Sequence, residues 1–240
     1  MWTHQLLQPL PPHNLFHSSY SPSKLTKNSS FAKLNSTHNT KTHNEIVNST
    51  IITLEDLPPN ALRRKKGEEW IGGFSLGVDL GMARTGLALS KGYSVRPLTV
   101  LELRGQKLEL RIMNIAEQEE ADEFIIGLPK SSDGMETTQS NIVRSVAGRL
   151  AVRAAERGWR VYLQDEYGTT TAAMNRMVDM GLSKFTRQKK LDAYAATMVL
   201  ERYFSTSGQK AELVVPKNLE LQGKLRKGPP KDEDLFSDED

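Results

Sequence analysis

The sequence predicts an α/β fold with a mixed five-stranded sheet and helices on both faces of that sheet. Two observations support this prediction. Three short apolar strands follow one another between residues 72 and 103, and beyond them strands alternate with amphipathic segments of helical period. Strands joined by short turns form an antiparallel meander, whereas strands separated by helices join a sheet in parallel through right-handed crossovers. The predicted element order is βββαβαβαα.

The first three strands account for the meander. The segment GFSLGVDLG is an apolar run that ends at Asp79, and RTGLALS forms the next strand. The third strand lies in YSVRPLTVLEL, with Pro97 near its start, where a missing amide donor costs least.

Helices and strands alternate in the remainder of the domain. KLELRIMNIAEQEE has apolar residues at helical spacing, and EFIIGLP is a buried-type strand that ends at Gly127 and Pro129. A long helix is expected from about Thr137 to Arg157, with Gly158 closing it. Its predicted apolar face consists of Ile142, Val146, Leu150 and Ala154. WRVYLQDE is the fifth strand, followed by two helices, from Thr169 or Thr170 to about Met180 and from about Arg187 to Phe204.

The segments on either side of this domain differ from it in composition. Residues 1–44 contain four lysines and no Asp or Glu, which is typical of an organelle transit peptide. The absence of arginine there favours the chloroplast over the mitochondrion, and an ordinary disordered tail is the alternative. We therefore interpret residues 1–66 as a transit peptide and disordered leader, 72–206 as the folded domain and 207–240 as a disordered acidic tail.

The composition excludes several kinds of chemistry. The chain has no cysteine, and all five histidines lie within the first 43 residues. Disulfides, thiolate zinc sites, serine–histidine hydrolysis and histidine-ligated metals are therefore excluded from the folded part. No run approaches the ~20 apolar residues that a membrane-spanning helix needs, so no membrane partner is expected. The remaining chemistry uses carboxylates, hydroxyls, basic side chains or a metal held by oxygen.

Three acids stand at or near the ends of predicted elements: Asp79 ends the first strand, Glu166 ends the fifth, and Asp192 lies early in the last helix. Each also has an ordinary structural explanation, as a turn residue, as an anion near a helix N-terminus, or as a partner of Lys189. If the three converge, their mutual repulsion calls for a cation, and Mg²⁺ or Mn²⁺ fits oxygen ligands best.

Four segments together resemble the YqgF family: GVDLGMARTGLALS, IIGLPKSSDG, QDEYGTTTAA and KKLDAYAATMVLERYF. The resemblance covers about Leu76 to Phe204. Members of that family are ribonuclease H-like proteins described as pre-16S rRNA nucleases and related to Holliday-junction resolvases. The resemblance implies a ribonuclease H-like fold. It also implies that Asp79, Glu166 and Asp192 hold one or two Mg²⁺ or Mn²⁺ ions for phosphodiester hydrolysis.

The sequence departs from the family pattern near this predicted site. Tyr167 stands where the family usually has arginine, Ala83 stands where it usually has a basic residue, and Lys130–Ser131–Ser132 replaces a more apolar run. Tyr167 either packs or stacks on an unpaired base. Basic residues near the acids are predicted to contact nucleic acid, namely Arg84, Lys130, Lys184, Arg187, Lys189 and Lys190. Arg149, Arg153 and Arg157 share a helix face, as a solvated stripe or a phosphate-binding rim.

The leading interpretation is a metal-dependent endonuclease whose nucleic-acid partner is pre-16S-type rRNA. One alternative is a Holliday-junction resolvase acting on branched DNA, which requires two active sites and hence a homodimer. Another is a non-catalytic RNA-binding factor for ribosome assembly. An actin-type ATPase is disfavoured, because the predicted domain leaves no room for a second phosphate-binding lobe.

Overall fold

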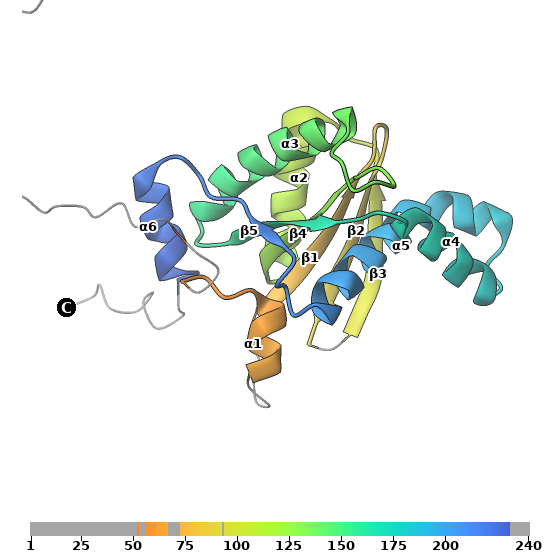
Figure 1. The fold of residues 1–240 in the computed structure, drawn as a ribbon, viewed down its shortest axis with the longest axis horizontal. Helices are drawn as coiled ribbons and strands as arrows, with labels where there is room; N and C mark the ends of the chain where they lie inside the picture. The colour runs from red at the N-terminus through yellow and green to blue at the C-terminus, as the bar shows by residue number, and fades with distance from the viewer. Residues whose placement is uncertain (1–51, 53–55, 67–72, 93, 231–240) are drawn as a thin grey trace, which may run out of the picture. The chain divides into compact units, whose positions relative to one another are not determined.

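The computed structural model describes residues 52, 56–66, 73–92 and 94–230 (Figure 1). The predicted transit peptide falls almost entirely on residues outside these ranges. The described chain forms a six-stranded sheet in the order β3-β2-β1-β4-β5-β6. The strands are β1 (Phe74–Leu80), β2 (Thr85–Lys91), β3 (Ser94–Leu101), β4 (Ala121–Leu128), β5 (Arg160–Asp165) and β6 (Glu212–Leu213).

The strand directions confirm the predicted topology. β1, β2 and β3 form an antiparallel meander, and β4 and β5 extend the sheet from β1 as parallel strands. The prediction of five strands is wrong by one, because β6 adds to the far edge antiparallel to β5. This strand is only two residues long, so its sequence carries no alternating pattern that would have indicated it.

Helices cover both faces of the sheet, as expected. α2 (Gly105–Gln118) and α3 (Thr138–Ala155) pack on one face, against a core that includes Leu76, Val78 and Leu80 of β1. α5 (Lys184–Ser205) packs on the opposite face, and α4 (Thr169–Asp179) packs against α5 (Figure 1). The two faces of β1 therefore pack against two different hydrophobic cores.

The buried face of α3 differs from the prediction at its first position. Ile142 is half-exposed, and Val143 and Ala147 occupy the core together with Leu150 and Ala154. The buried positions recur at intervals of four, three and four residues, which keeps them on one side of a helix. The predicted apolar face began at Ile142, one residue before the first buried apolar residue, Val143. Ile142 therefore lies on the side of the helix that is turned away from the sheet.

The flanking segments correct the predicted domain boundaries. α1 (Asn60–Lys66) falls within the predicted leader, and β6 and α6 (Leu219–Lys227) fall within the predicted disordered tail. Ile52, Leu57 and Leu225 are buried in one small cluster with Ala155 at the end of α3. A few well-placed apolar side chains therefore anchor segments whose overall composition is polar. Within the described residues, no helix combines the length and hydropathy required to cross a bilayer.

Candidate active site

The three acids noted in the sequence lie at the carboxyl-terminal edge of the parallel strands. Asp79 is the penultimate residue of β1 and pairs in register with Gly86 of β2, whereas Glu166 directly follows β5. Asp192 belongs to α5, which packs across β1 and β2. Side chains alternate along a strand, so Asp79 points to the same face as Gly77, which α5 covers. The structure therefore gathers the three acids at one edge and one face of the sheet.

Two glycines make this gathering sterically feasible. A Cβ atom at Gly86 would overlap the backbone of Asp192, so the bare backbone of β2 allows α5 to approach closely. A Cβ atom at Gly127 would overlap the carboxylate of Glu166. The sequence predicted that Gly127 and Pro129 end this strand, and β4 ends at Leu128, directly before Pro129, with Gly127 inside it. Gly127 leaves space on β4 for the Glu166 side chain.

The acids influence one another electrostatically. Burial raises the pKa of Asp79 to about 7, with a further contribution from the negative charge of Asp192. Burial likewise raises the pKa of Glu166 to about 8, reinforced by Asp79 and Asp165 and opposed by Arg202. Asp79 interacts with both other acids and so lies electrostatically between them. Such crowding favours protonation unless a cation neutralises the group.

Two buried carboxylate oxygens at this site have no hydrogen-bond partner in the described part of the chain, Glu166 Oε2 and Asp192 Oδ2. Arg84 Nε lies 2.9 Å from Asp192 Oδ2, but its orientation makes this an ionic contact rather than a hydrogen bond. Arg84 Nη1 also donates to the Gln188 carbonyl at 3.0 Å. An arginine therefore already contacts one member of the trio, whereas the sequence had predicted that Arg84 contacts nucleic acid.

The donor set is chemically suited to a hard divalent ion. Carboxylate oxygens are the ligands that Mg²⁺ and Mn²⁺ prefer, and two of these oxygens are buried without a hydrogen bond. Among residues 52, 56–66, 73–92 and 94–230, however, no three acidic side chains are arranged so that they would hold a metal ion. The residue types fit the ion, but the carboxylates do not form a closed cage as they stand.

The predicted basic residues surround this edge of the sheet. Lys130 Nζ lies 3.7 Å from Oδ2 of Asp165, which is the residue immediately before Glu166. The other four lie on the first turns of α5, ahead of Asp192, and three of them are exposed: Lys184, Lys189 and Lys190. Arg187 donates to the Leu182 carbonyl. The structure thus brings positive charge beside the acids, and contact with nucleic acid remains a prediction for these residues.

The arginine stripe on α3 serves another purpose. Arg149 Nε and Arg153 Nε lie 2.6 Å and 3.5 Å from the carboxylate oxygens of Glu109, which is buried on α2. Arg157 lies over the ring of Trp159, 5.5 Å from its centroid. Two of the three arginines therefore neutralise a buried acid between α2 and α3. The two sequence-based interpretations, a solvated stripe and a phosphate-binding rim, did not include this role.

Two residues near Glu166 were missed from the sequence. Asp165 ends β5 and accepts a hydrogen bond from the backbone of Tyr167 at 2.8 Å, and Arg202 of α5 donates to the Tyr167 carbonyl at 2.8 Å. No motif links Arg202 to residues so far upstream, so only tertiary structure reveals the contact. The Tyr167 side chain is 54% exposed, so the expectation that it packs is wrong.

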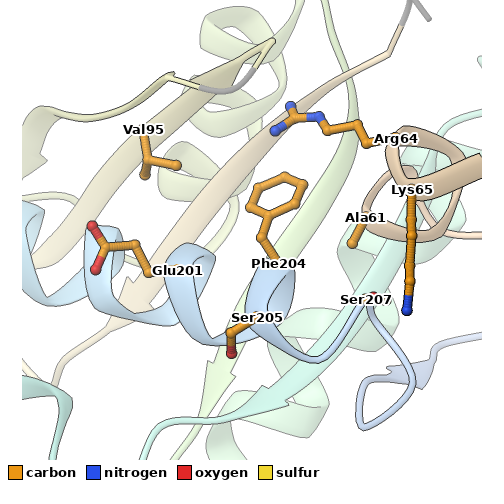
Figure 2. A pocket seen from close by; sticks show the side chains of 8 residues that line it. All are labelled: Ala61, Arg64, Lys65, Val95, Glu201, Phe204, Ser205 and Ser207. Atoms are coloured by element: carbon orange, nitrogen blue, oxygen red, sulfur yellow. The ribbon is translucent and has the colours of Figure 1, made fainter. Parts of the chain in front are cut away.

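A separate cavity of about 550 Å³ lies between α1, β3 and the end of α5 (Figure 2). Its lining includes Arg64, Glu201 and Phe204, and Arg64 stacks over the Phe204 ring at 4.1 Å. None of the three acids lines it. The chemistry suggested by the sequence therefore lies outside this cavity, at the open edge of the sheet.

Comparison with known proteins identifies the family. A family model named RuvX and described as Holliday junction resolvase matches residues 73–206. The chain belongs to the RuvX (YqgF) family. A relative from Moorella thermoacetica, named as a proposed pre-16S rRNA nuclease, is 31% identical over 137 residues, 56% of this chain and 96% of the relative. A Rickettsia africae protein of the same name is 36% identical over 129 residues, 52% of this chain and 82% of the relative.

A solved structure of Thermus thermophilus RuvC with a Holliday junction is similar with a TM-score of 0.40 and 17% identity, covering 59% of this chain and 99% of that chain.

The RuvX family match contains Asp79, Glu166, Asp192 and every predicted basic residue. In contrast, α1, β6 and α6 all lie outside it. The candidate site is therefore contained within the RuvX family domain, and the added elements pack on its periphery.

Proposed function

We propose that this protein is a metal-dependent endonuclease that hydrolyses phosphodiester bonds in structured nucleic acid, with precursor 16S-type rRNA as its substrate. The observation that supports this proposal is the coupled acidic trio, in which Glu166 Oε2 and Asp192 Oδ2 are buried and receive no hydrogen bond from the residues that the structure describes. Family membership supports the same conclusion, and the substrate follows from the name shared by the relatives.

The residues of the site divide into two roles. Asp79, Glu166 and Asp192 hold Mg²⁺ or Mn²⁺. When bound, such an ion polarises the scissile phosphodiester and stabilises the charge that develops during displacement. The basic residues bind the substrate backbone, because phosphate contacts position a nucleic acid without reading its sequence. They are Arg84, Lys130, Lys184, Arg187, Lys189 and Lys190.

Arg84 is one of the basic residues and also contacts one of the three acids. In the protein alone it lies against Asp192. If the charge of Asp192 were neutralised, only the hydrogen bond to the Gln188 carbonyl would hold Arg84 there, and its guanidinium would be available to a substrate phosphate. Arginine suits this role because its planar donors match phosphate oxygens.

The test is cleavage of labelled 16S rRNA precursor by the purified protein with Mg²⁺ or Mn²⁺. Asp79→Asn and Glu166→Gln should each lower the rate on the order of 1,000-fold, about 4 kcal/mol in activation free energy. Both variants should still bind the RNA. Arg176→Ala, which removes an exposed ion pair with Glu201 away from the acids, is the matched control. Full activity in Asp79→Asn, or no cleavage by the unmodified protein, would refute the proposal.

The description of the family model favours a second candidate, resolution of Holliday junctions. This activity requires two active sites on opposite strands and hence a symmetric dimer. A four-way DNA junction and the rRNA precursor should be compared in one assay, together with the mass of the protein in solution. Symmetric junction cleavage by a dimer would favour the resolvase; cleavage of RNA alone would exclude it.

We also propose that the segment before residue 52 directs import into the chloroplast, with the mitochondrion as the alternative. Its acid-poor, hydroxyl-rich composition supports this proposal. Import assays of the full chain with isolated chloroplasts and with mitochondria test it. Uptake by neither organelle would contradict it.

A further inference from the structure

We propose that Arg202 is a positioning residue that fixes the backbone around Glu166 and so aims its carboxylate at the ion site. This inference deepens the proposed function, because it assigns a residue to the site on which that function rests. Arg202 lies near the end of α5, ten residues beyond Asp192 on the same helix. Its side chain extends to the loop that follows β5.

The contacts of Arg202 bracket Glu166. Its Nη1 donates to the Asp165 carbonyl at 3.0 Å, and its Nη2 donates to the Tyr167 carbonyl at 2.8 Å. One planar guanidinium therefore bridges the carbonyls of the residues immediately before and after Glu166. A lysine ammonium lacks this forked arrangement of donors. We refer to these two hydrogen bonds as the Arg202 clamp.

Glu166 needs such support because it lies outside regular structure. β5 ends at Asp165, and α4 begins at Thr169 after Gly168, which adopts a positive φ of 77° and offers no side-chain cap. The backbone of Glu166 itself makes two hydrogen bonds: its amide donates to the Leu128 carbonyl at 3.2 Å, and its carbonyl accepts from the Thr169 amide at 3.0 Å. The Arg202 clamp adds support on either side, at the carbonyls of Asp165 and Tyr167.

The side chain of Glu166 does not hold itself in place. Its Oε2 atom is buried and accepts no hydrogen bond from the described residues. Its direction is therefore set by the backbone that carries it and by the space above Gly127. A small rotation of the 165–167 segment would turn the carboxylate away from Asp79, so the Arg202 clamp has a direct consequence for the site.

A simpler explanation is that Arg202 forms an ordinary surface ion pair with Asp165. Arg202 Nη1 does lie 3.4 Å from Asp165 Oδ1, and the two side chains are 37% and 39% exposed. Ion pairs with this exposure contribute little to stability. Asp165 has a second cation nearby in Lys130, so its charge does not depend on Arg202 alone. The clamp is distinguished by its bonds to carbonyls, which the ion pair does not require.

The chain offers a closely matched control. Arg176 of α4 makes two hydrogen bonds, at 2.5 and 2.9 Å, to the carboxylate of Glu201, the residue next to Arg202. Its side chain is 42% exposed, close to the value for Arg202. Within the described part of the chain, Arg176 makes its hydrogen bonds and ion pair with Glu201 and none with residues 165–167. Replacing Arg176 or Arg202 removes one partly exposed guanidinium from α4 or α5, respectively, but only the replacement of Arg202 removes the clamp.

The first measurement is hydrogen exchange of the full chain without added metal. Arg202→Ala should accelerate exchange of the amides in residues 165–169 by roughly tenfold or more, because the segment opens locally. Arg176→Ala should leave them unchanged. Arg202→Lys should behave like Arg202→Ala, because it keeps the charge and loses the fork. Unchanged exchange in Arg202→Ala overturns the inference, and so does full protection in Arg202→Lys.

The second measurement is Mn²⁺ affinity, read from the electron paramagnetic resonance signal of free Mn²⁺. Arg202→Ala should weaken binding roughly 10- to 100-fold, the range expected for groups that orient metal ligands, and Arg176→Ala should not. If Arg202→Ala exchanges faster but binds Mn²⁺ with unchanged affinity, Arg202 does not orient the Glu166 carboxylate toward the ion, and the inference is overturned. If the unmodified protein binds Mn²⁺ but cleaves no nucleic acid, the proposed function fails and the clamp stands. If it binds no Mn²⁺ at all, both fail.

Discussion

The two ends of the parallel strands each bury acidic side chains, but they neutralise them in different ways. At the amino-terminal end, Ser75, Glu123 and Arg160 lie side by side in register on β1, β4 and β5. Glu123 is fully buried and accepts hydrogen bonds from the Ser75 hydroxyl, the Tyr203 hydroxyl and the Asn60 amide, at 2.9, 2.7 and 2.8 Å. Arg160 Nη2 lies 2.7 Å from Asp122. Here the protein supplies donors to both carboxylate oxygens of Glu123, although burial still raises the pKa of that group and Arg160 Nε lacks a hydrogen bond within the described residues.

At the carboxyl-terminal end the partners are incomplete. Among the described residues, nothing donates a hydrogen bond to the buried oxygens Glu166 Oε2 and Asp192 Oδ2, and only the second of them has a cation beside it, Arg84 at 2.9 Å. A buried polar group without a partner costs stability at either end. The difference shows that the amino-terminal cluster, which we call the structural cluster, completes the fold. In the carboxyl-terminal trio, Arg84 already contacts Asp192, and the carboxylates of Asp79 and Glu166 are left for a ligand to neutralise.

The largest expected effect on stability comes from removing the leading segment that completes the structural cluster. A chain that begins at residue 73 loses Asn60 and Leu57, leaving Glu123 and Arg160 under-bonded. Its free energy of unfolding should fall by more than about 5 kcal/mol, enough to unfold a typical domain. A chain that begins at residue 48 is the control and should match the full chain in urea denaturation. Equal stability of both truncations would contradict a structural role for α1.

The next effect isolates one member of the structural cluster. Arg160→Met should lower the free energy of unfolding by about 3–5 kcal/mol, because it leaves Glu123 and Asp122 buried without their cation. Arg176→Met, at an exposed pair, should cost less than about 1 kcal/mol. Urea denaturation measures both. Similar losses in the two variants would show that burial is not what distinguishes the pairs.

The pH dependence of stability should reveal the acidic trio. The pKa values of Asp79 and Glu166, about 7 and about 8, exceed those in an unfolded chain, so the folded state retains protons that the unfolded state releases. Without divalent ions, stability should fall as pH rises from about 4 to about 8, by several kcal/mol, since one pKa unit corresponds to about 1.4 kcal/mol.

Two controls separate the trio from other titrating groups. The double variant Asp79→Asn/Glu166→Gln should lose most of this slope, and Mg²⁺ at pH 8 should stabilise only the unmodified protein. Thermal melting across the pH series provides the measurement. A slope that persists undiminished in the double variant would assign it to other groups.

The smallest effect on stability should accompany a large effect on ion binding. Gly127→Ala places a methyl group against the carboxylate of Glu166, which can move aside because it is the end of a flexible side chain. Stability should change by less than about 1 kcal/mol, whereas Mn²⁺ affinity should fall about tenfold or more. Gly148→Ala, in open space on α3, is the control and should leave Mn²⁺ affinity unchanged. Wild-type affinity in Gly127→Ala would disprove the role given to this glycine.

Local pattern accounts for what the sequence predicted well. The first five strands, their order and four of the helices follow from the spacing of apolar residues and from turn residues, which are local signals. The positions of Asp79, Glu166 and Asp192 at element ends follow from the same spacing, and their convergence follows from the topology. The error at Ile142 is local as well, since it displaced the start of the apolar face of α3 by one residue.

Long-range contacts account for what the sequence missed. α1, β6 and α6 pack through a few residues, such as Leu57 and Leu225, whose partners lie far away in the chain. The ion pair of Arg84 with Asp192 and the Arg202 clamp on residues 165–167 join segments separated by 35 residues or more. Apolar periodicity, which reports on neighbours within one element, carries no information about such pairs.

The sequence by itself determined the fold class, the exclusion of cysteine and histidine chemistry from the folded part, and the positions of the three carboxylates for which we propose a catalytic role. Only the tertiary structure decided which buried acids have partners and which do not. The physical reason is that the cost of burying a charge depends on every donor within hydrogen-bond reach. Those donors are assembled by folding from Asn60, Ser75, Arg160 and Tyr203 at one end of the sheet. At the other end, no described residue donates a hydrogen bond to Glu166 Oε2 or Asp192 Oδ2.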